Sequence, residues 1–295
     1  MTKKYVKREH YIPQFALKFF QDESEKIPFT NIEKKPLKLM YTDTPKLMQE
    51  KDFYEIKDVH GEYVLRNSIE DIYSSLEGDI SINYKKILNL SFSETFEADF
   101  AGIIKSGEWS DIESSLLLYL VLILVRGKAV KKLTYSKSKL PINYQHIMHL
   151  LCTTSQMKTA EFAKRLYNGE ELEGILSFIK EDSKGSIWLK LTKHIMGKYQ
   201  IRVCLARGER KFFLSDNPVI VQKFEGEDYI LPLSPDMCII LVPMNIEKNM
   251  LKLDMNIYSL YDDAVNKINK ESIDNTDKLI IVSNESDLSF IEKYV

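Results

Sequence analysis

The chain has 295 residues, of which 44% are hydrophobic and 28% are charged, and its net charge is −2. A chain of this length and composition is typical of a globular protein and buries a sizeable core without disulfides or structural metals. Its three cysteines are widely spaced and form no CxxC pair, which excludes a disulfide framework or a zinc ribbon and indicates free thiols in a reducing compartment.

Two hydrophobic segments bear on targeting, and neither supports a membrane location. The apolar stretch in the first 15 residues is too short and too interrupted for a signal peptide. The longest apolar run, Leu116–Val125, is about half of the roughly 20 residues that a membrane helix needs. We therefore expect a cytoplasmic protein in which this run is a buried core helix.

In chain order, the pattern first predicts a short helix at 15–20, a loop at 21–36, and strands at 38–41, 51–56 and 63–65. Asn67 and Ser68 are suited to cap a helix that continues to Leu88, because its apolar residues recur every three or four positions. The most apolar helix begins at Trp109 and ends near Arg126. Two more helices are predicted at 141–168 and 171–181.

From residue 185 onward the pattern changes to strands. The segments 199–206 and 212–215 alternate in hydrophobicity and predict a hairpin, and the segments 229–235 and 237–243 predict two more strands. A helix at 264–275, a strand at 278–283 and a short last helix complete the chain. The sequence thus predicts an α+β fold, with a mostly helical N-terminal two-thirds (about 1–184) packed on a mainly antiparallel C-terminal sheet (about 185–295). We expect one domain over 1–295.

The basic residues are unevenly distributed. No Asp or Glu occurs between Ser114 and Ala160, and a second basic window lies at 190–211. The bases of the first window are Arg126, Lys128, Lys131, Lys132, Lys137, Lys139 and Lys158. These windows predict either a positive face that attracts a polyanion such as nucleic acid, or helix faces that Lys and Arg simply solvate.

Three ordered motifs resemble a bacterial family. They are His-Tyr-Ile-Pro-Gln-Phe at 10–15, Lys-Asp-Phe-Tyr at 51–54 with the acidic helix after it, and Ser-Asp-Asn-Pro-Val at 215–219 followed by Leu-Pro-Leu-Ser-Pro at 231–235. Their order and spacing are similar to those of the family catalogued as domain of unknown function 4238, over about residues 5–285. The chain departs from the family pattern at 126–128, where Arg-Gly-Lys replaces Arg-Thr-Pro. The resemblance implies a cytoplasmic bacterial or phage protein and no particular reaction.

Four residues are candidates for catalysis, each with a structural alternative. His10 is suited to act as a general acid or base, or else to hydrogen-bond across strands with Gln14. Asp216 follows a strand, as a metal ligand or base, or else as an Asx-turn. Glu70 and Glu77 are seven residues apart on one helix face, which points either into a cleft or to solvent.

Together these residues suggest a hydrolase that acts on a phosphodiester or another polyanion, such as a nuclease-like effector of phage defence. Asp216 and Glu77 would then hold Mg²⁺ or a similar divalent metal. The remaining residues are candidates for substrate binding: Gln14, Asn217, Arg126 and Lys128. The alternative is a non-catalytic module that binds protein or nucleic acid through the same motifs.

Overall fold

The computed structural model describes residues 5–57, 63–64, 67–91, 93, 95–127, 195, 197–221, 229–243 and 257–295. The helices expected at 141–168 and 171–181, and Lys128, lie outside these residues. Among the described helices, none is long and apolar enough to cross a membrane.

The described chain before residue 67 consists mainly of short strands, with one short helix. The elements are β1 (Arg8–His10), α1 (Gln14–Leu17), the 3-10 turn η1 (Lys18–Phe20), β2 (Ile27–Asn31), β3 (Met40–Thr42), the 3-10 turn η2 (Thr44–Lys46), β4 (Gln49–Lys51), β5 (Ile56–Lys57) and β6 (Tyr63–Val64). Antiparallel pairing joins β1 to β4 and β5 to β6 as two-stranded ribbons.

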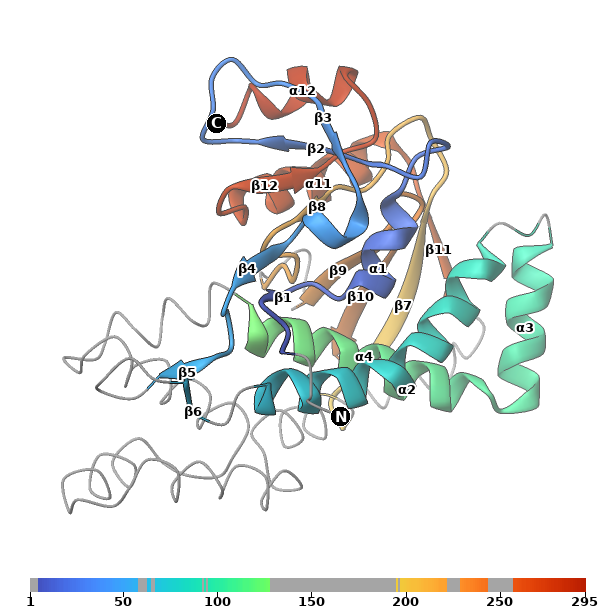
Figure 1. The fold of residues 1–295 in the computed structure, drawn as a ribbon. Coiled ribbons are helices and arrows are strands. Elements are labelled where there is room, and N and C mark those ends of the chain that lie inside the picture. Colours follow the sequence, from blue (N-terminus) through green and yellow to red (C-terminus); the bar gives the residue numbers. More distant parts are fainter. Residues whose placement is uncertain are drawn as a thin grey trace.

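Three consecutive helices follow: α2 (Ser68–Leu90), α3 (Phe96–Ser106) and α4 (Trp109–Arg126). The expected starts of α2 and α4 are confirmed, but the Asn67 side chain does not cap α2; it accepts a hydrogen bond from the Val6 amide instead. The apolar run of α4 is buried, as its length predicted. Figure 1 shows α2 and α4 lying side by side, with α3 beyond them.

The remaining described chain forms strands and two helices. They are β7 (Tyr199–Ala206), β8 (Leu214–Ser215), β9 (Tyr229–Ser234), β10 (Met237–Pro243), β11 (Ile257–Leu260), α11 (Asp262–Asp274), β12 (Leu279–Ile281) and α12 (Ser286–Ile291). One sheet has the order β11-β7-β10-β9 and the other β3-β2-β12-β8. Figure 1 shows α11 and α12 beside the second sheet, at the end of the molecule opposite α2 and α4.

The expected separation into a helical N-terminal part and a C-terminal sheet is wrong. Strands β2 and β3 come from the first 42 residues, yet they share a sheet with β8 and β12. The first sheet also contains a parallel pair, β7 with β11. The expected hairpin of 199–206 with 212–215 is wrong too, because β7 pairs with β10 and β11 whereas β8 pairs with β12.

The first sheet is covered on both faces, which explains its nearly continuous apolar sequence. Along β7, Ile201 and Val203 face the large core that α2 and α4 also line. The alternate residue Cys204 faces a smaller core shared with α11. The large core draws residues from Tyr11 to Ile281, so the N-terminal motif packs directly against elements from the rest of the chain.

Candidate functional site

A buried arginine at the end of α4 joins two of the three sequence motifs. The side chain of Arg126 is 1% exposed. Its Nε donates a hydrogen bond to the Tyr54 hydroxyl at 2.8 Å, and its two terminal nitrogens donate to a Glu77 carboxylate oxygen and to the His10 carbonyl. The guanidinium also lies 4.6 Å from the ring centre of Tyr73. Arg126 therefore ties β1, the chain after β4, and α2 to the end of α4.

Tyr54 completes this junction because its hydroxyl both accepts and donates a hydrogen bond. It accepts from Arg126 and donates to the His10 carbonyl at 3.3 Å. The ring packs edge-on against Tyr73, with 5.1 Å between centroids. The backbone carbonyl of His10 consequently receives two donors, which fixes the position of β1 relative to the helices.

The two faces of the β1–β4 ribbon carry side chains of opposite charge. Arg8 pairs with Lys51 and His10 with Gln49, and residues two apart on a strand share a face. Arg8 and Lys51 are exposed, and His10 is partly exposed, so this is the outer face. We call these four residues the ribbon face. Glu9 points the opposite way and is 1% exposed.

The His10 imidazole lies at the surface of the ribbon face. Its Nδ1 is 3.5 Å from the Gln14 side-chain nitrogen, and its Nε2 is buried without a hydrogen bond. Burial, and then the charge of Arg126, lowers the pKa of His10 below its ordinary 6.5, although the backbone of Pro45 and Thr44 acts in the other direction. The imidazole is therefore neutral at pH 7.

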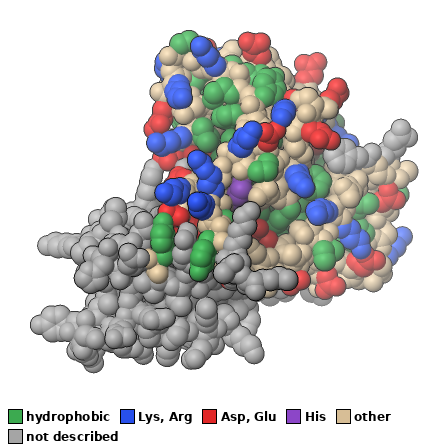
Figure 2. Space-filling model, in the orientation of Figure 1, with side chains coloured by type: hydrophobic (Ala, Val, Ile, Leu, Met, Phe, Trp, Pro, Cys, Tyr) green, Lys and Arg blue, Asp and Glu red, His purple; other side chains and the backbone are tan. Residues whose placement is uncertain are grey.

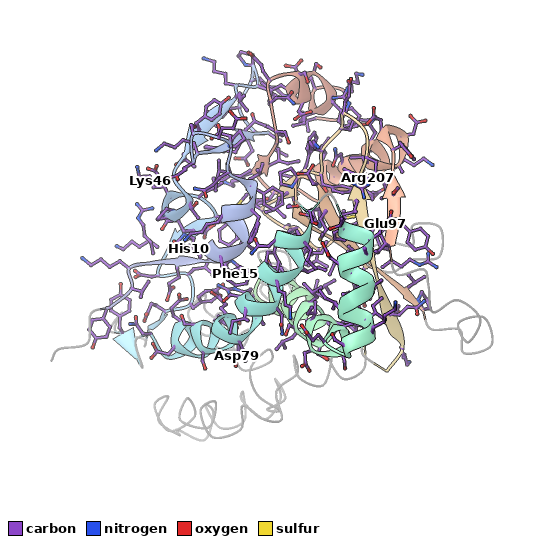
Figure 3. All side chains as sticks on the ribbon, turned by 90° about the vertical axis from the view of Figure 1, so that its right-hand side faces the viewer. His10, Phe15, Lys46, Asp79, Glu97 and Arg207 are labelled. Carbon is purple, nitrogen blue, oxygen red and sulfur yellow. The ribbon has the colours of Figure 1, made fainter. Side chains whose placement is uncertain are left out.

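Figure 2 shows Lys and Arg side chains around a histidine on one face of the molecule. Figure 3 places His10 on the same side as Lys46 and away from Arg207. Lys46 is paired with Asp43 at 2.6 Å, whereas Arg8 and Lys51 form no ion pair within the described ranges. The two cations of the ribbon face are therefore available to an anion, although the exposed Glu50 lies next to Lys51 in the same ribbon.

Behind the ribbon lies a cluster of carboxyl groups, the inner acid cluster: Glu9, Glu55 and Glu70. Burial raises the pKa of Glu9 to about 8, and the nearby Glu55 and Glu70 add to this shift although the Tyr54 amide opposes it. Burial also raises the pKa of Glu70 to about 7, against the attraction of Arg126. Glu9 and Glu70 therefore keep their protons to a higher pH than an exposed glutamate does.

Asp216 and Asn217 form a tight turn beside this junction. Asp216 is fully buried, and its two carboxylate oxygens accept hydrogen bonds from the amides of Asp277 at 2.8 Å and Lys278 at 3.1 Å. Asn217 donates to the Asn275 side chain at 3.2 Å. Its side-chain oxygen is 3.5 Å from where a Cβ on Gly127 would lie. The turn therefore packs against the end of α4.

The structure brings most of the candidate residues into one region but gives them different surroundings. Arg126 contacts Glu77 and the backbone of His10, Glu70 is close enough to feel its charge, and Gln14 adjoins the His10 ring. Lys128 lies outside the described residues. The catalytic and binding roles of these residues stay predictions.

Sequence reasoning did not single out Tyr54, Glu9 or Arg8. Tyr54 belongs to the Lys-Asp-Phe-Tyr motif, and this membership was the one feature of the sequence that could have marked it as a candidate. Arg8 and Glu9 precede His10 in the same strand. Because side chains alternate between the two faces of a strand, Glu9 is buried whereas Arg8 is exposed.

The donors proposed for a metal do not fit one. Both carboxylate oxygens of Asp216 accept hydrogen bonds from backbone amides. The Glu77 carboxylate is paired with the Arg126 guanidinium, whose positive charge disfavours a metal ion beside it. Across the described part of the chain, no group of three or more His, Cys, Asp or Glu side chains is arranged to hold a metal ion.

Comparison with known proteins identifies a family. The model of the family described as "Protein of unknown function (DUF4238)" matches residues 8–286, nearly the whole chain. The chain belongs to this family. All three motifs that carried the resemblance lie inside the matched range. No curated protein and no solved structure matches the chain.

Proposed function

We propose that this DUF4238 protein hydrolyses the phosphodiester backbone of a nucleic acid without a metal ion, with His10 as general base and Arg8 and Lys51 as phosphate-binding cations. The observation that carries the proposal is the ribbon face itself, where a neutral imidazole lies among cations without ion pairs. A nucleic-acid substrate also fits the cytoplasmic location that the sequence predicts.

The state of the imidazole supports the role of base. The Gln14 amide nitrogen is a donor, so the neighbouring Nδ1 of His10 accepts and carries a lone pair. The lowered pKa keeps Nδ1 unprotonated at neutral pH. When a water molecule displaces the Gln14 amide from Nδ1, the imidazole takes a proton from that water as its oxygen bonds to phosphorus, a step that typically contributes about a hundredfold or more. The bond from phosphorus to the leaving oxygen then breaks, and the imidazolium returns the proton to that oxygen.

The position of the imidazole is supported from behind. Arg126 and Tyr54 both donate to the His10 carbonyl, so the catalytic strand is anchored to the protein core. In this proposal Arg126 and Glu77 are positioning residues that never touch the substrate. The turn at Asp216 has the same supporting role, since its carboxylate is occupied by backbone amides.

The test is cleavage of labelled single-stranded RNA and DNA, with excess EDTA and with Mg²⁺. We expect cleavage in EDTA, a loss of about a hundredfold in rate for His10→Asn, and an unchanged melting temperature for that variant. The double variant Arg8→Gln/Lys51→Gln should weaken binding and flatten its salt dependence. The control Lys85→Gln/Lys105→Gln removes two exposed lysines from α2 and α3 and should behave as the unaltered protein. Absence of cleavage on every substrate, or cleavage only with Mg²⁺, contradicts the proposal.

A second candidate is a non-catalytic nucleic-acid-binding module. It is favoured by the direct cross-strand pair of Arg8 and Lys51, because like charges in that position repel and a bound anion relieves the repulsion. The two candidates differ in one result. If the protein only binds, His10→Asn has no effect on any readout, whereas Arg8→Gln/Lys51→Gln still reduces affinity.

A further inference from the structure

A pocket lies among the N-terminal strands, away from the ribbon face. It is a pocket of about 450 Å³ between β2 and the loop that leads to β3. Its lining residues are Thr30, Asn31, Lys34, Lys35, Pro36, Lys38 and Met40. Figure 1 shows this loop beside the C-terminal end of the chain, and the Lys35 ammonium donates to the Val295 carbonyl at 3.4 Å. The volume lies in the usual range of small-molecule sites.

We propose that this pocket binds a small amphipathic anion, a molecule with an apolar body and one carboxylate, phosphate or sulfonate group. The walls supply both kinds of contact. Pro36 and Met40 contribute apolar surface, and three lysines contribute positive charge. Of these lysines, Lys34 and Lys38 are exposed and form no ion pair in the described segments, where Glu33 pairs with Lys278 instead.

Strand β2 forms the floor of the pocket through Thr30 and Asn31. Thr30 is completely buried and pairs with Ile280 of the neighbouring strand, so its hydroxyl lies beneath the pocket and does not reach a ligand. The three lysines therefore carry the recognition of the anionic group.

The probe for this site is 8-anilinonaphthalene-1-sulfonate, which carries aromatic rings and one sulfonate and fluoresces when it leaves water. N-phenyl-1-naphthylamine has the same rings without the charge and serves as the matched neutral probe. We expect saturable binding of the anionic probe to the full chain. Lys34→Gln/Lys38→Gln should weaken it about tenfold and should leave the neutral probe nearly unaffected, because only the charge contact is lost.

Two further variants separate the pocket from other surfaces. The control Lys85→Gln/Lys105→Gln removes the same charge from α2 and α3 and should leave both probes unchanged. Thr30→Val replaces the partnerless hydroxyl beneath the pocket by a methyl group of similar volume; it should keep or raise the melting temperature and leave both probes unchanged. The proposal is overturned if the anionic probe does not saturate, or if Lys34→Gln/Lys38→Gln stays within about twofold of the control. Equal weakening of both probes also overturns it.

Discussion

Replacement of Arg126 by Met tests whether the buried junction holds the N-terminal motif in place. Methionine keeps the aliphatic bulk of arginine but leaves the Glu77 carboxylate without its cation and removes one of two donors from the His10 carbonyl. Removal of one partner from a buried ion pair usually costs about 3–5 kcal/mol. The Glu77 side chain is 22% exposed, so solvent screens part of that charge and the lower end applies. Loss of the contact with the Tyr73 ring adds about 1 kcal/mol.

The expected total is therefore about 4 kcal/mol, or a fall in melting temperature of roughly 6 °C for a chain of this size. Thermal and urea unfolding followed by circular dichroism measure both quantities. The decisive comparison is Glu77→Gln in each background. In the Arg126→Met protein it removes a stranded charge and should restore stability, whereas in the unaltered protein it should destabilise. If Glu77→Gln costs the same in both backgrounds, the ion pair is not what Arg126 contributes.

Three further predictions concern stability. The folded-state pKa of Glu9 is raised to about 8, above its unfolded value of 4.5. The protonated Glu9 side chain therefore contributes its full share to the free energy of unfolding below pH 4.5, and this share is lost as the pH rises through 8. Glu9→Gln should therefore flatten the decline of melting temperature between about pH 5 and pH 8, and an unchanged slope contradicts the assigned protonation. Asp216→Ala should lower stability by about 3 kcal/mol in urea unfolding, because two backbone amides lose their acceptor. Gly208→Ala places a Cβ 2.0 Å from Asp262 and should lower the melting temperature, whereas Gly102→Ala in α3 meets nothing within 4 Å and should raise it.

The long helices and the strands of the first sheet could be predicted because their patterns extend over many residues. In α4 the apolar run ends at Arg126, where the helix ends. In β7 and β10 the apolar residues occupy both faces, and the flanking turns mark their ends. These elements carry their own signal, so tertiary context was not needed to find them.

The short N-terminal strands could not be predicted in the same way. Strand β4 reads Gln-Glu-Lys and has no apolar residue, so only its pairing with β1 makes it a strand. Strand β2 lies in a segment expected to be loop because it contains Pro28, which usually excludes an inner strand. In the structure Pro28 lies beyond the residues that pair with β12, and its carbonyl accepts the Val282 amide at 3.1 Å. Pairing across more than 200 residues leaves no local pattern.

The sequence named part of the candidate region but did not single out Tyr54, Glu9 or Arg8, and it did not reveal what each residue contacts. His10, Glu77 and Arg126 were all chosen from the sequence, and the structure joins them through one guanidinium. What the sequence did not reveal is which side of β1 each group faces, because a three-residue strand has no measurable period. The strand direction therefore had to come from the three-dimensional structure.

The charge balance of the junction explains why its motifs are interdependent. Arg126 neutralises Glu77, and the nearby Glu9 and Glu70 avoid an excess of negative charge by taking up protons, as their raised pKa values require. Arg126 also donates to the His10 carbonyl, and its charge adds to the lowering of the His10 pKa by burial. A change at residue 126 therefore alters both the anchoring of β1 and the electrostatic surroundings of the His10 imidazole.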